Sequence, residues 1–217
     1  MKGRDIVPRL NHVKSARKAN PEAGIKVGDE YWWAAFRSPG RAQGYKRFWK
    51  SPPKRSELIS SPFYAALAES EDTFNELAAQ HDRNDPDLSN VASDLRSVAE
   101  TIREIASEQE EKLSNMPEGL QQGGTGELLQ ERASNCESLA DSIDSAADEL
   151  ENWSLSDQDY ELGARYDAHE KALAEFNQSK RKNKGDPPTL SQDDLDEISR
   201  LVDAAIDDQV GGVDFSI

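Results

Sequence analysis

Two stretches in the middle of the chain place apolar residues at alternating three- and four-residue steps, the spacing at which two helices pack along a seam. Between them stands NMPEGLQQGGTG, whose proline and glycines end a helix. The pattern predicts an antiparallel helical hairpin about 40 Å long at 1.5 Å rise per residue. Its seam comprises Leu88, Val91, Leu95, Val98, Ile102 and Ile105 on the first helix and Leu129, Cys136, Leu139, Ile143, Ala146, Leu150 and Trp153 on the second.

Nearer the N-terminus, two aromatic segments have the two-residue period of β-strands. EYWWAAFRS and YKRFWKS are rich in strand-favouring residues, and the polar loop PGRAQG joins them, so they predict a β-hairpin. A lone hairpin is marginally stable in water, so we expect one aromatic face to pack on the helix that follows. On the first strand, one face has Trp32, Ala34 and Phe36, and the other has Tyr31, Trp33 and Arg37. On the second strand, one face has Tyr45, Arg47 and Trp49, and the other has Lys46, Phe48 and Lys50.

Helix-start signals precede three of the predicted helices. Ser61, followed by proline, predicts a helix over about residues 62–80. Asp85, also followed by proline, marks the start of the first hairpin helix. Ser191 and Asp194 approximate a capping box that opens a helix near the C-terminus.

These elements predict a mainly α fold with a small N-terminal β-hairpin, of α+β class, and a long antiparallel coiled-coil-like helical hairpin. Four segments follow from the pattern. Residues 1–27 form a basic flexible arm, 28–82 a module of β-hairpin plus helix, and 83–154 the helical hairpin. Residues 155–217 form an acidic helical C-terminal region with a basic linker and a tail.

The charge is divided unevenly along the chain. Residues 1–55 contain 14 Lys/Arg and 4 Asp/Glu, a net +10, whereas residues 56–217 contain 12 and 38, a net −26, which together give the total of −16. Because net charge governs partners and solubility rather than fold, each part needs its own interpretation.

The basic segment, residues 28–55, is the candidate surface for contacting nucleic acid or an acidic protein. Lysines and arginines neutralise phosphates, and aromatic rings stack on unpaired bases. The alternative is that the aromatics form the core of a small β-α module and the basic residues only surround it. The candidate nucleic-acid-binding residues are Trp33, Arg37, Arg41, Tyr45, Lys46, Arg47, Trp49, Lys50, Lys54 and Arg55.

The acidic helices leave three functions open. They can mediate contacts with a protein partner, or their closely spaced carboxylates can imitate the phosphates of a duplex, as in an acidic decoy or anti-defence protein that occupies a host nucleic-acid-binding protein. The third is a structural coiled-coil component that assembles as a homo-oligomer.

The C-terminal sequence QVGGVDFSI predicts a tail after a Gly-Gly break. Its form is that of a short peptide anchor for a partner's groove, and a frayed terminus is the alternative. The candidate partner-binding residues are Val213, Phe215 and Ile217.

No sequence pattern typical of catalysis, metal binding or cofactor binding is present. His12, His81 and His169 are far apart and accompany no metal-binding motif. Cys136 lies on the apolar seam, as a small buried hydrophobic residue does, and QQGGTGE lacks the lysine of a phosphate loop and predicts a turn. We therefore expect a non-enzymatic protein with no cofactor and no metal.

The expected location is the cytoplasm, with no membrane contact. No run of residues approaches the roughly 18 apolar positions of a membrane span. The first residues lack the apolar stretch of a signal peptide, and one cysteine forms no intramolecular disulfide.

Several short motifs resemble landmarks of a group of small uncharacterised proteins encoded by phages, prophages and their hosts. These motifs are HVKSARKANP, GDEYWWAAFR, SPPKRSEL, and NMPEGLQ followed by LLQERA, and they span about residues 12–136. The resemblance implies a basic N-terminal β module, long acidic helices and a phage accessory protein acting in the host cytoplasm. The group brings no known mechanism, and the helix and linker after Trp153 have no counterpart in it.

Overall fold

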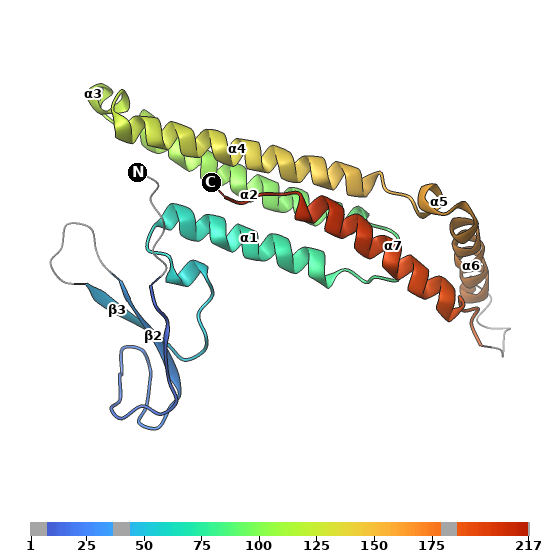
Figure 1. The fold of residues 1–217 in the computed structure, drawn as a ribbon, viewed down its shortest axis with the longest axis horizontal. Helices are drawn as coiled ribbons and strands as arrows, with labels where there is room; N and C mark the ends of the chain where they lie inside the picture. Colours follow the sequence, from blue (N-terminus) through green and yellow to red (C-terminus); the bar gives the residue numbers. More distant parts are fainter. Residues whose placement is uncertain (1–7, 37–43, 179–185, 217) are drawn as a thin grey trace. The chain divides into compact units, whose positions relative to one another are not determined.

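The computed structural model describes residues 8–36, 44–178 and 186–216, and these are mainly helical with a small antiparallel sheet (Figure 1). The chain divides into two compact units, Met1–Asp72 and Thr73–Ile217, and the division falls inside helix α1 (Pro62–Gln80). The predicted fold class is confirmed, and α1 has the predicted bounds.

The sheet of the first unit has three strands in the order β1-β2-β3. β2 (Tyr31–Phe36) and β3 (Tyr45–Trp49) form the predicted hairpin, whose register pairs Trp32 with Trp49. β1 (Asn11–Val13) pairs antiparallel with the other edge of β2. The sequence does not predict β1, because three residues are too few to reveal an alternating pattern.

Residues 8–27, within the predicted basic arm, form structure that the sequence does not indicate. Beyond β1, the backbone N–H of Ala16 donates to the carbonyl of Asp29 at 2.8 Å, and the N–H of Gly28 donates to the carbonyl of Ala16 at 2.9 Å. Ala16 and Ile25 are both buried. The segment contains few large apolar residues, but satisfied backbone groups and two buried side chains hold it in place.

The second unit is built on the antiparallel pair α2 (Ser89–Ser114) and α4 (Gly124–Glu151), joined through the short helix α3 (Glu118–Gln121). The predicted seam is buried, and Leu95, Ile102 and Ile143 have no exposed surface. Small residues flank the seam every seven positions, so the two helices can approach closely. These buried alanines are Ala92, Ala99 and Ala106 on α2 and Ala133, Ala140 and Ala147 on α4.

Both hairpin helices begin at points that the sequence signals do not give. α2 starts at Ser89 rather than behind Asp85, because the carboxylate of Asp87 accepts from the N–H of Ser89 at 3.0 Å and holds a turn there. α4 starts at Gly124, within the predicted turn. A β-carbon at Gly126 would lie 1.9 Å from the carbonyl oxygen of Gln121, so this close approach requires glycine.

The C-terminal region adds α5 (Leu155–Gln158), α6 (Tyr160–Gln178) and α7 (Gln192–Gly211). The hydroxyl of Ser191 accepts from the N–H of Asp194 at 3.2 Å, which confirms the predicted helix start. α7 packs on α4 and buries Ile198, Val202 and Ile206.

Candidate functional site

One side of the sheet, here called the Phe36 face, forms the core of the first unit. Ala34 and Phe36 are buried together with Leu58, and Trp49 packs against them. Leu58 belongs to η1 (Ser56–Leu58), a short helical turn that precedes α1. The Phe36 face therefore packs on η1. The sequence instead predicts packing on the helix that begins at residue 62.

Side chains on the Phe36 face are already engaged within the unit. The rings of Phe36 and Tyr45 stack with centroids 5.2 Å apart, and the Arg47 guanidinium lies 4.8 Å from the Phe36 centroid. Trp49 Nε1 donates to Glu57 Oε1 at 3.1 Å. Three predicted nucleic-acid contacts therefore make internal contacts on this side, although two of them, Tyr45 and Arg47, are exposed.

The opposite side, here called the Trp33 face, comprises Tyr31, Trp33, Ala35, Lys46 and Phe48, with Asn11 and Val13 of β1 beside them. Its three aromatic rings are half-buried, and Lys46 is exposed. The ammonium of Lys46 lies 4.5 Å from the Trp33 ring centroid, a cation–π contact. The rings of Tyr31 and Phe48 contact each other with centroids 6.1 Å apart. This face combines aromatic surface with positive charge and contains no carboxylate.

The remaining basic candidates are spread over the chain that follows β3. Lys50 comes directly after the strand and is exposed, as is Lys54. Arg55 forms an ion pair with Glu71. The structure therefore brings Lys46 and Trp33 together, with Lys50 next in the chain after β3. Two further candidates, Arg37 and Arg41, lie outside the described residues.

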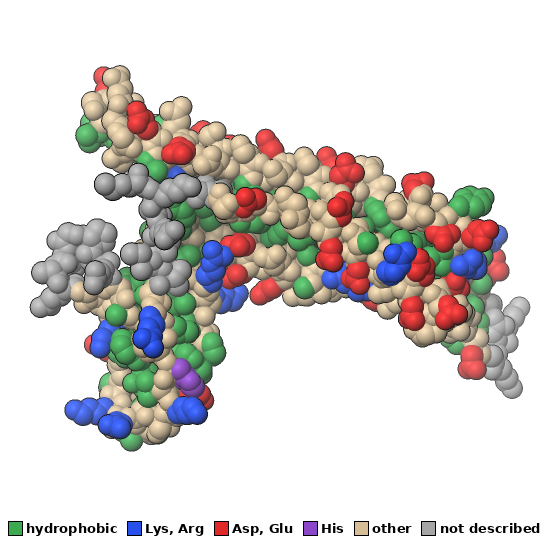
Figure 2. All heavy atoms as spheres, in the orientation of Figure 1, with side chains coloured by type: hydrophobic (Ala, Val, Ile, Leu, Met, Phe, Trp, Pro, Cys, Tyr) green, Lys and Arg blue, Asp and Glu red, His purple; other side chains and the backbone are tan. Residues whose placement is uncertain are grey.

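The two units differ in charge. The segment Met1–Asp72 contains 14 Lys/Arg and 8 Asp/Glu, a net +6, and Thr73–Ile217 contains 12 and 34, a net −22. Figure 2 shows lysines and arginines gathered over the sheet, and carboxylates along the helices. Phosphate is therefore attracted by the first unit and repelled by the second.

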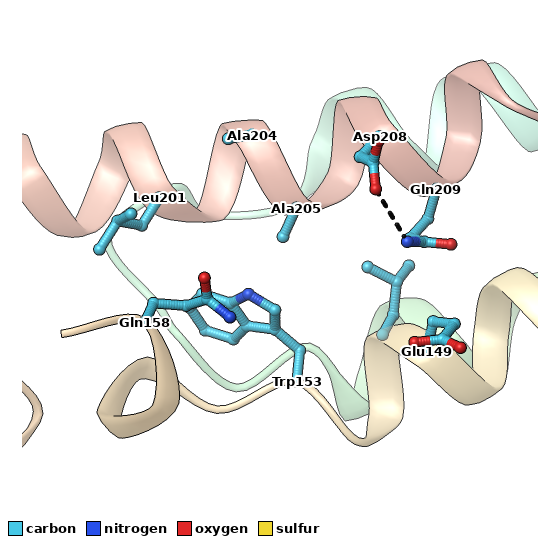
Figure 3. Close-up of a pocket in the computed structure, with 9 residues that line it drawn as sticks. Glu149, Trp153, Gln158, Leu201, Ala204, Ala205, Asp208 and Gln209 are labelled. Atoms are coloured by element: carbon cyan, nitrogen blue, oxygen red, sulfur yellow. Dashed lines mark hydrogen bonds between the residues drawn. The ribbon is translucent and has the colours of Figure 1, made fainter. Parts of the chain in front are cut away.

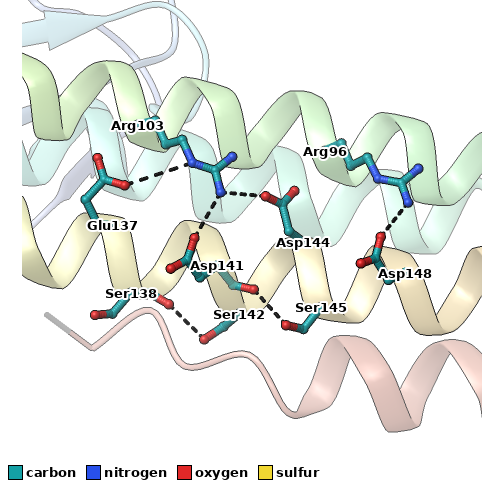
Figure 4. Close-up of polar contacts among 9 residues, drawn as sticks. All are labelled: Arg96, Arg103, Glu137, Ser138, Asp141, Ser142, Asp144, Ser145 and Asp148. Atoms are coloured by element: carbon teal, nitrogen blue, oxygen red, sulfur yellow. Dashed lines mark hydrogen bonds and ion pairs between the residues drawn. The ribbon is translucent and has the colours of Figure 1, made fainter.

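Arginines of α2 bind part of the carboxylate surface of α4 (Figure 4). Arg103 Nη2 donates to Asp141 at 3.0 Å and to Asp144 at 2.5 Å, and these hydrogen bonds raise the arginine's pKa above its ordinary value. Arg96 donates to Asp148 at 2.6 Å. Arg96 stands seven residues before Arg103 on α2, and Asp148 stands seven residues after Asp141 on α4. The repeated spacing fixes one register between the helices and neutralises part of their acidity.

A pocket of about 470 Å³ opens between the end of α4, α5 and α7 within the second unit (Figure 3). Both apolar and polar side chains line it, and the indole of Trp153 is among them. The sequence does not reveal this pocket, because its residues come from three separate helices and from Trp153 in the turn between α4 and α5. The lining residues are Glu149, Leu150, Trp153, Gln158, Leu201, Ala204, Ala205, Asp208 and Gln209.

The C-terminal tail lies against the chain's own helices. The ring of Phe215 is 5.3 Å from that of Phe74, which is buried in α1, and Val213 is half-buried. Two of the predicted partner-binding residues therefore have an internal contact or partial cover, and Ile217 lies outside the described residues.

Cys136 is buried in the hairpin seam, as the sequence predicts, and burial raises the pKa of its thiol to about 11. No group of three or more His, Cys, Asp or Glu residues in the described part of the chain is placed to hold a metal ion. Across the same residues, no helix is both long and apolar enough to cross a membrane.

Comparison with known proteins assigns no function to these sites. No protein-family model matches the chain, and comparison with curated proteins and with solved structures gives no match either. Function is therefore inferred from the geometry of the two units, and the resemblance to small phage-encoded proteins stays a prediction.

Proposed function

We propose that this protein is a non-enzymatic, phage-type accessory binding protein that contacts nucleic acid through the Trp33 face. The observation that carries the proposal is the difference between the two faces of one sheet. On the Phe36 face, Ala34 and Phe36 are buried with Leu58, and Trp49 donates to Glu57, while Tyr45 and Arg47 at its margin are exposed. The Trp33 face keeps half-buried rings beside an exposed lysine.

The arrangement of Lys46 and Trp33 suits a strand with unpaired bases. The ammonium lies over the indole and can move to a phosphate, which exposes the ring to a base. Stacking on an aromatic side chain is worth about 1–3 kcal/mol per base and requires a base that is not stacked in a duplex. We therefore expect single-stranded nucleic acid to bind more tightly than duplex.

Fluorescence anisotropy with labelled single-stranded and duplex oligonucleotides tests the proposal in the full-length protein. Lys46→Glu removes a phosphate contact and adds a repulsion, so affinity is expected to fall about tenfold or more. The matched control is Lys171→Glu, the same charge reversal on the exposed surface of α6, with an expected loss below about twofold. Equal losses of affinity for the two variants, or an affinity that does not depend on salt concentration, would contradict the proposal.

The stacking part has its own pair of variants. Trp33→Leu is expected to weaken single-strand binding by about 5- to 100-fold, whereas Trp153→Leu in the second unit leaves it unchanged. Circular dichroism checks that each variant is folded. Equal affinity for duplex and single strand, unaffected by Trp33→Leu, would remove stacking from the mechanism.

An acidic decoy is the second candidate, favoured by a row of exposed carboxylates on α2 that includes Glu100, Glu104 and Glu111. The ion pairs of Arg96 and Arg103 with α4 weaken it, because a duplex mimic needs free charge. A decoy should capture a basic host protein that added DNA displaces. Capture unaffected by excess DNA counts against mimicry.

If the protein is instead a structural coiled-coil component, light scattering should report an oligomer, and a monomer at micromolar concentration argues against that role.

A further inference from the structure

The pocket between α4, α5 and α7 combines an indole with carboxylates and amides (Figure 3). The Trp153 ring lies beneath α7, facing Ala205, with the amide of Gln158 beside it. Glu149 and Asp208 come from facing helices at one end of the pocket. At about 470 Å³ the pocket falls within the range of roughly 300–1,000 Å³ that is usual for small-ligand sites.

The position of the carboxylates is unfavourable for the helices themselves. α4 ends two residues beyond Glu149 and α7 ends three residues beyond Asp208, so both lie in last turns, where the helix dipole is negative. Neither last turn contains a basic residue. Arg96 forms ion pairs with two other carboxylates at this end of α4, those of Asp148 and Glu151. Within the described residues, however, neither Glu149 nor Asp208 forms an ion pair.

We infer that this pocket binds the guanidinium group of an arginine side chain presented by a basic protein partner. A planar guanidinium stacks on an indole and at the same time donates to carboxylates and amides at its edge. A lysine ammonium is a point charge and cannot make both kinds of contact so well. Asp208 already accepts from Gln209 at 3.1 Å and keeps further lone pairs for a ligand.

Charge complementarity supports the same partner. The net charge of −22 on this unit attracts basic peptides from a distance and repels nucleic acid. The site thus gives the acidic helical unit its own class of ligand. It does not depend on nucleic-acid binding by the Trp33 face, so either proposal can fail without the other.

A titration of the full-length protein followed by NMR tests the inference through the indole N–H of Trp153, assigned with Trp153→Phe. N-acetylargininamide at low salt is expected to shift this signal saturably. N-acetylcitrullinamide, which has nearly the same shape but no charge, is expected to bind at least about tenfold more weakly. Equal affinity for the two probes, or no saturable shift, would overturn the inference.

Paired variants locate the charge. Asp208→Asn combined with Glu149→Gln is expected to weaken N-acetylargininamide binding by about tenfold or more. Asp207→Asn combined with Glu161→Gln is the matched control, because it removes the same two charges from exposed residues outside the pocket, and its expected effect is below about twofold. An equal loss in both would show general attraction rather than a site. Spermidine that competes better than a Gly-Arg-Gly peptide would overturn the assignment to arginine.

Discussion

The sheet of the first unit and the helical hairpin of the second are stabilised by different chemistry. In the sheet, Phe36 is surrounded by aromatic rings and by the Arg47 guanidinium. In the hairpin, fully buried aliphatic side chains such as Ile102 and Ile143 fill the seam, and arginines bind carboxylates at its margin.

The difference shows which surfaces each unit leaves for other tasks. The sheet needs one of its two faces for folding, so the Trp33 face can keep rings and charge for a ligand. The hairpin uses its whole apolar stripe internally, and its ion pairs repeat with the same seven-residue spacing as the seam. The surfaces that the second unit leaves open include its acidic exterior and the pocket beside Trp153.

The largest effect is expected from a charge inside the seam. Leu95 has no exposed surface, so Leu95→Asp should lower the free energy of unfolding by about 4 kcal/mol or more, because the carboxylate loses its hydration. Urea unfolding followed by circular dichroism at 222 nm measures the loss. Leu128→Asp is the control, since Leu128 is 41% exposed on α4 and should cost less than about 1 kcal/mol. Similar losses for both would refute the assigned seam.

A smaller effect is expected from the aromatic core of the sheet. Phe36→Leu keeps an apolar side chain but removes the ring contacts with Tyr45 and Trp49, at a cost of about 1–3 kcal/mol. Phe48→Leu on the Trp33 face serves as the control and should cost less. Tryptophan fluorescence during unfolding compares the two variants. A greater loss for Phe48→Leu would reverse the roles assigned to the two faces.

The ion pairs of Arg103 should contribute less again. Arg103→Ala is expected to cost about 1 kcal/mol at low salt and less in 1 M salt, because the pairs are partly exposed and salt screens them. Arg200 pairs within its own helix with Glu197, so Arg200→Ala should have a smaller effect on unfolding. A loss for Arg103→Ala that does not depend on salt would point to packing rather than charge.

The smallest effect concerns alkaline pH. The folded Cys136 thiol has a pKa raised to about 11, whereas an unfolded thiol ionises near about 8.5, so ionisation favours the unfolded chain as pH rises between these values. From pH 7 to pH 9 this group should lower the free energy of unfolding by about 0.8 kcal/mol. The measurement compares wild type with Cys136→Ala at both pH values. An identical pH dependence in both would contradict the burial of Cys136 as a neutral thiol.

Much of the fold can be predicted from the sequence, because its signals are local and periodic. The seam that contains Leu95 and Ile143 follows from spacing alone, and Ser191 marks its helix start through one hydrogen bond within the same turn. β1 is different, because it depends on pairing with β2 about twenty residues away. The contact of Phe215 with Phe74 likewise joins distant parts of the chain.

The candidate site can be predicted in part. Alternation separates the two faces within each strand but does not match the faces of one strand to those of the other. From the sequence, Trp33 is expected to be free together with Tyr45 and Trp49, whereas the register puts Trp33 on one face with Lys46, and Tyr45 and Trp49 on the other. Alternation does not tell which face of the sheet is covered, because that depends on contacts with Leu58 and Glu57 in the segment after β3. The sequence therefore predicts Trp49 and Arg47 as nucleic-acid contacts, although in the structure both donate hydrogen bonds to Glu57.

The most direct test of the central claim is an NMR titration of the full-length protein with a single-stranded oligonucleotide, observing the indole N–H signals of its four tryptophans. If the Trp33 face is the binding surface, the Trp33 signal should shift most, and the signals of Trp49 and Trp153 should change little. A shift of Trp49 or Trp153 without one of Trp33, or no shift at saturating oligonucleotide, would contradict the account.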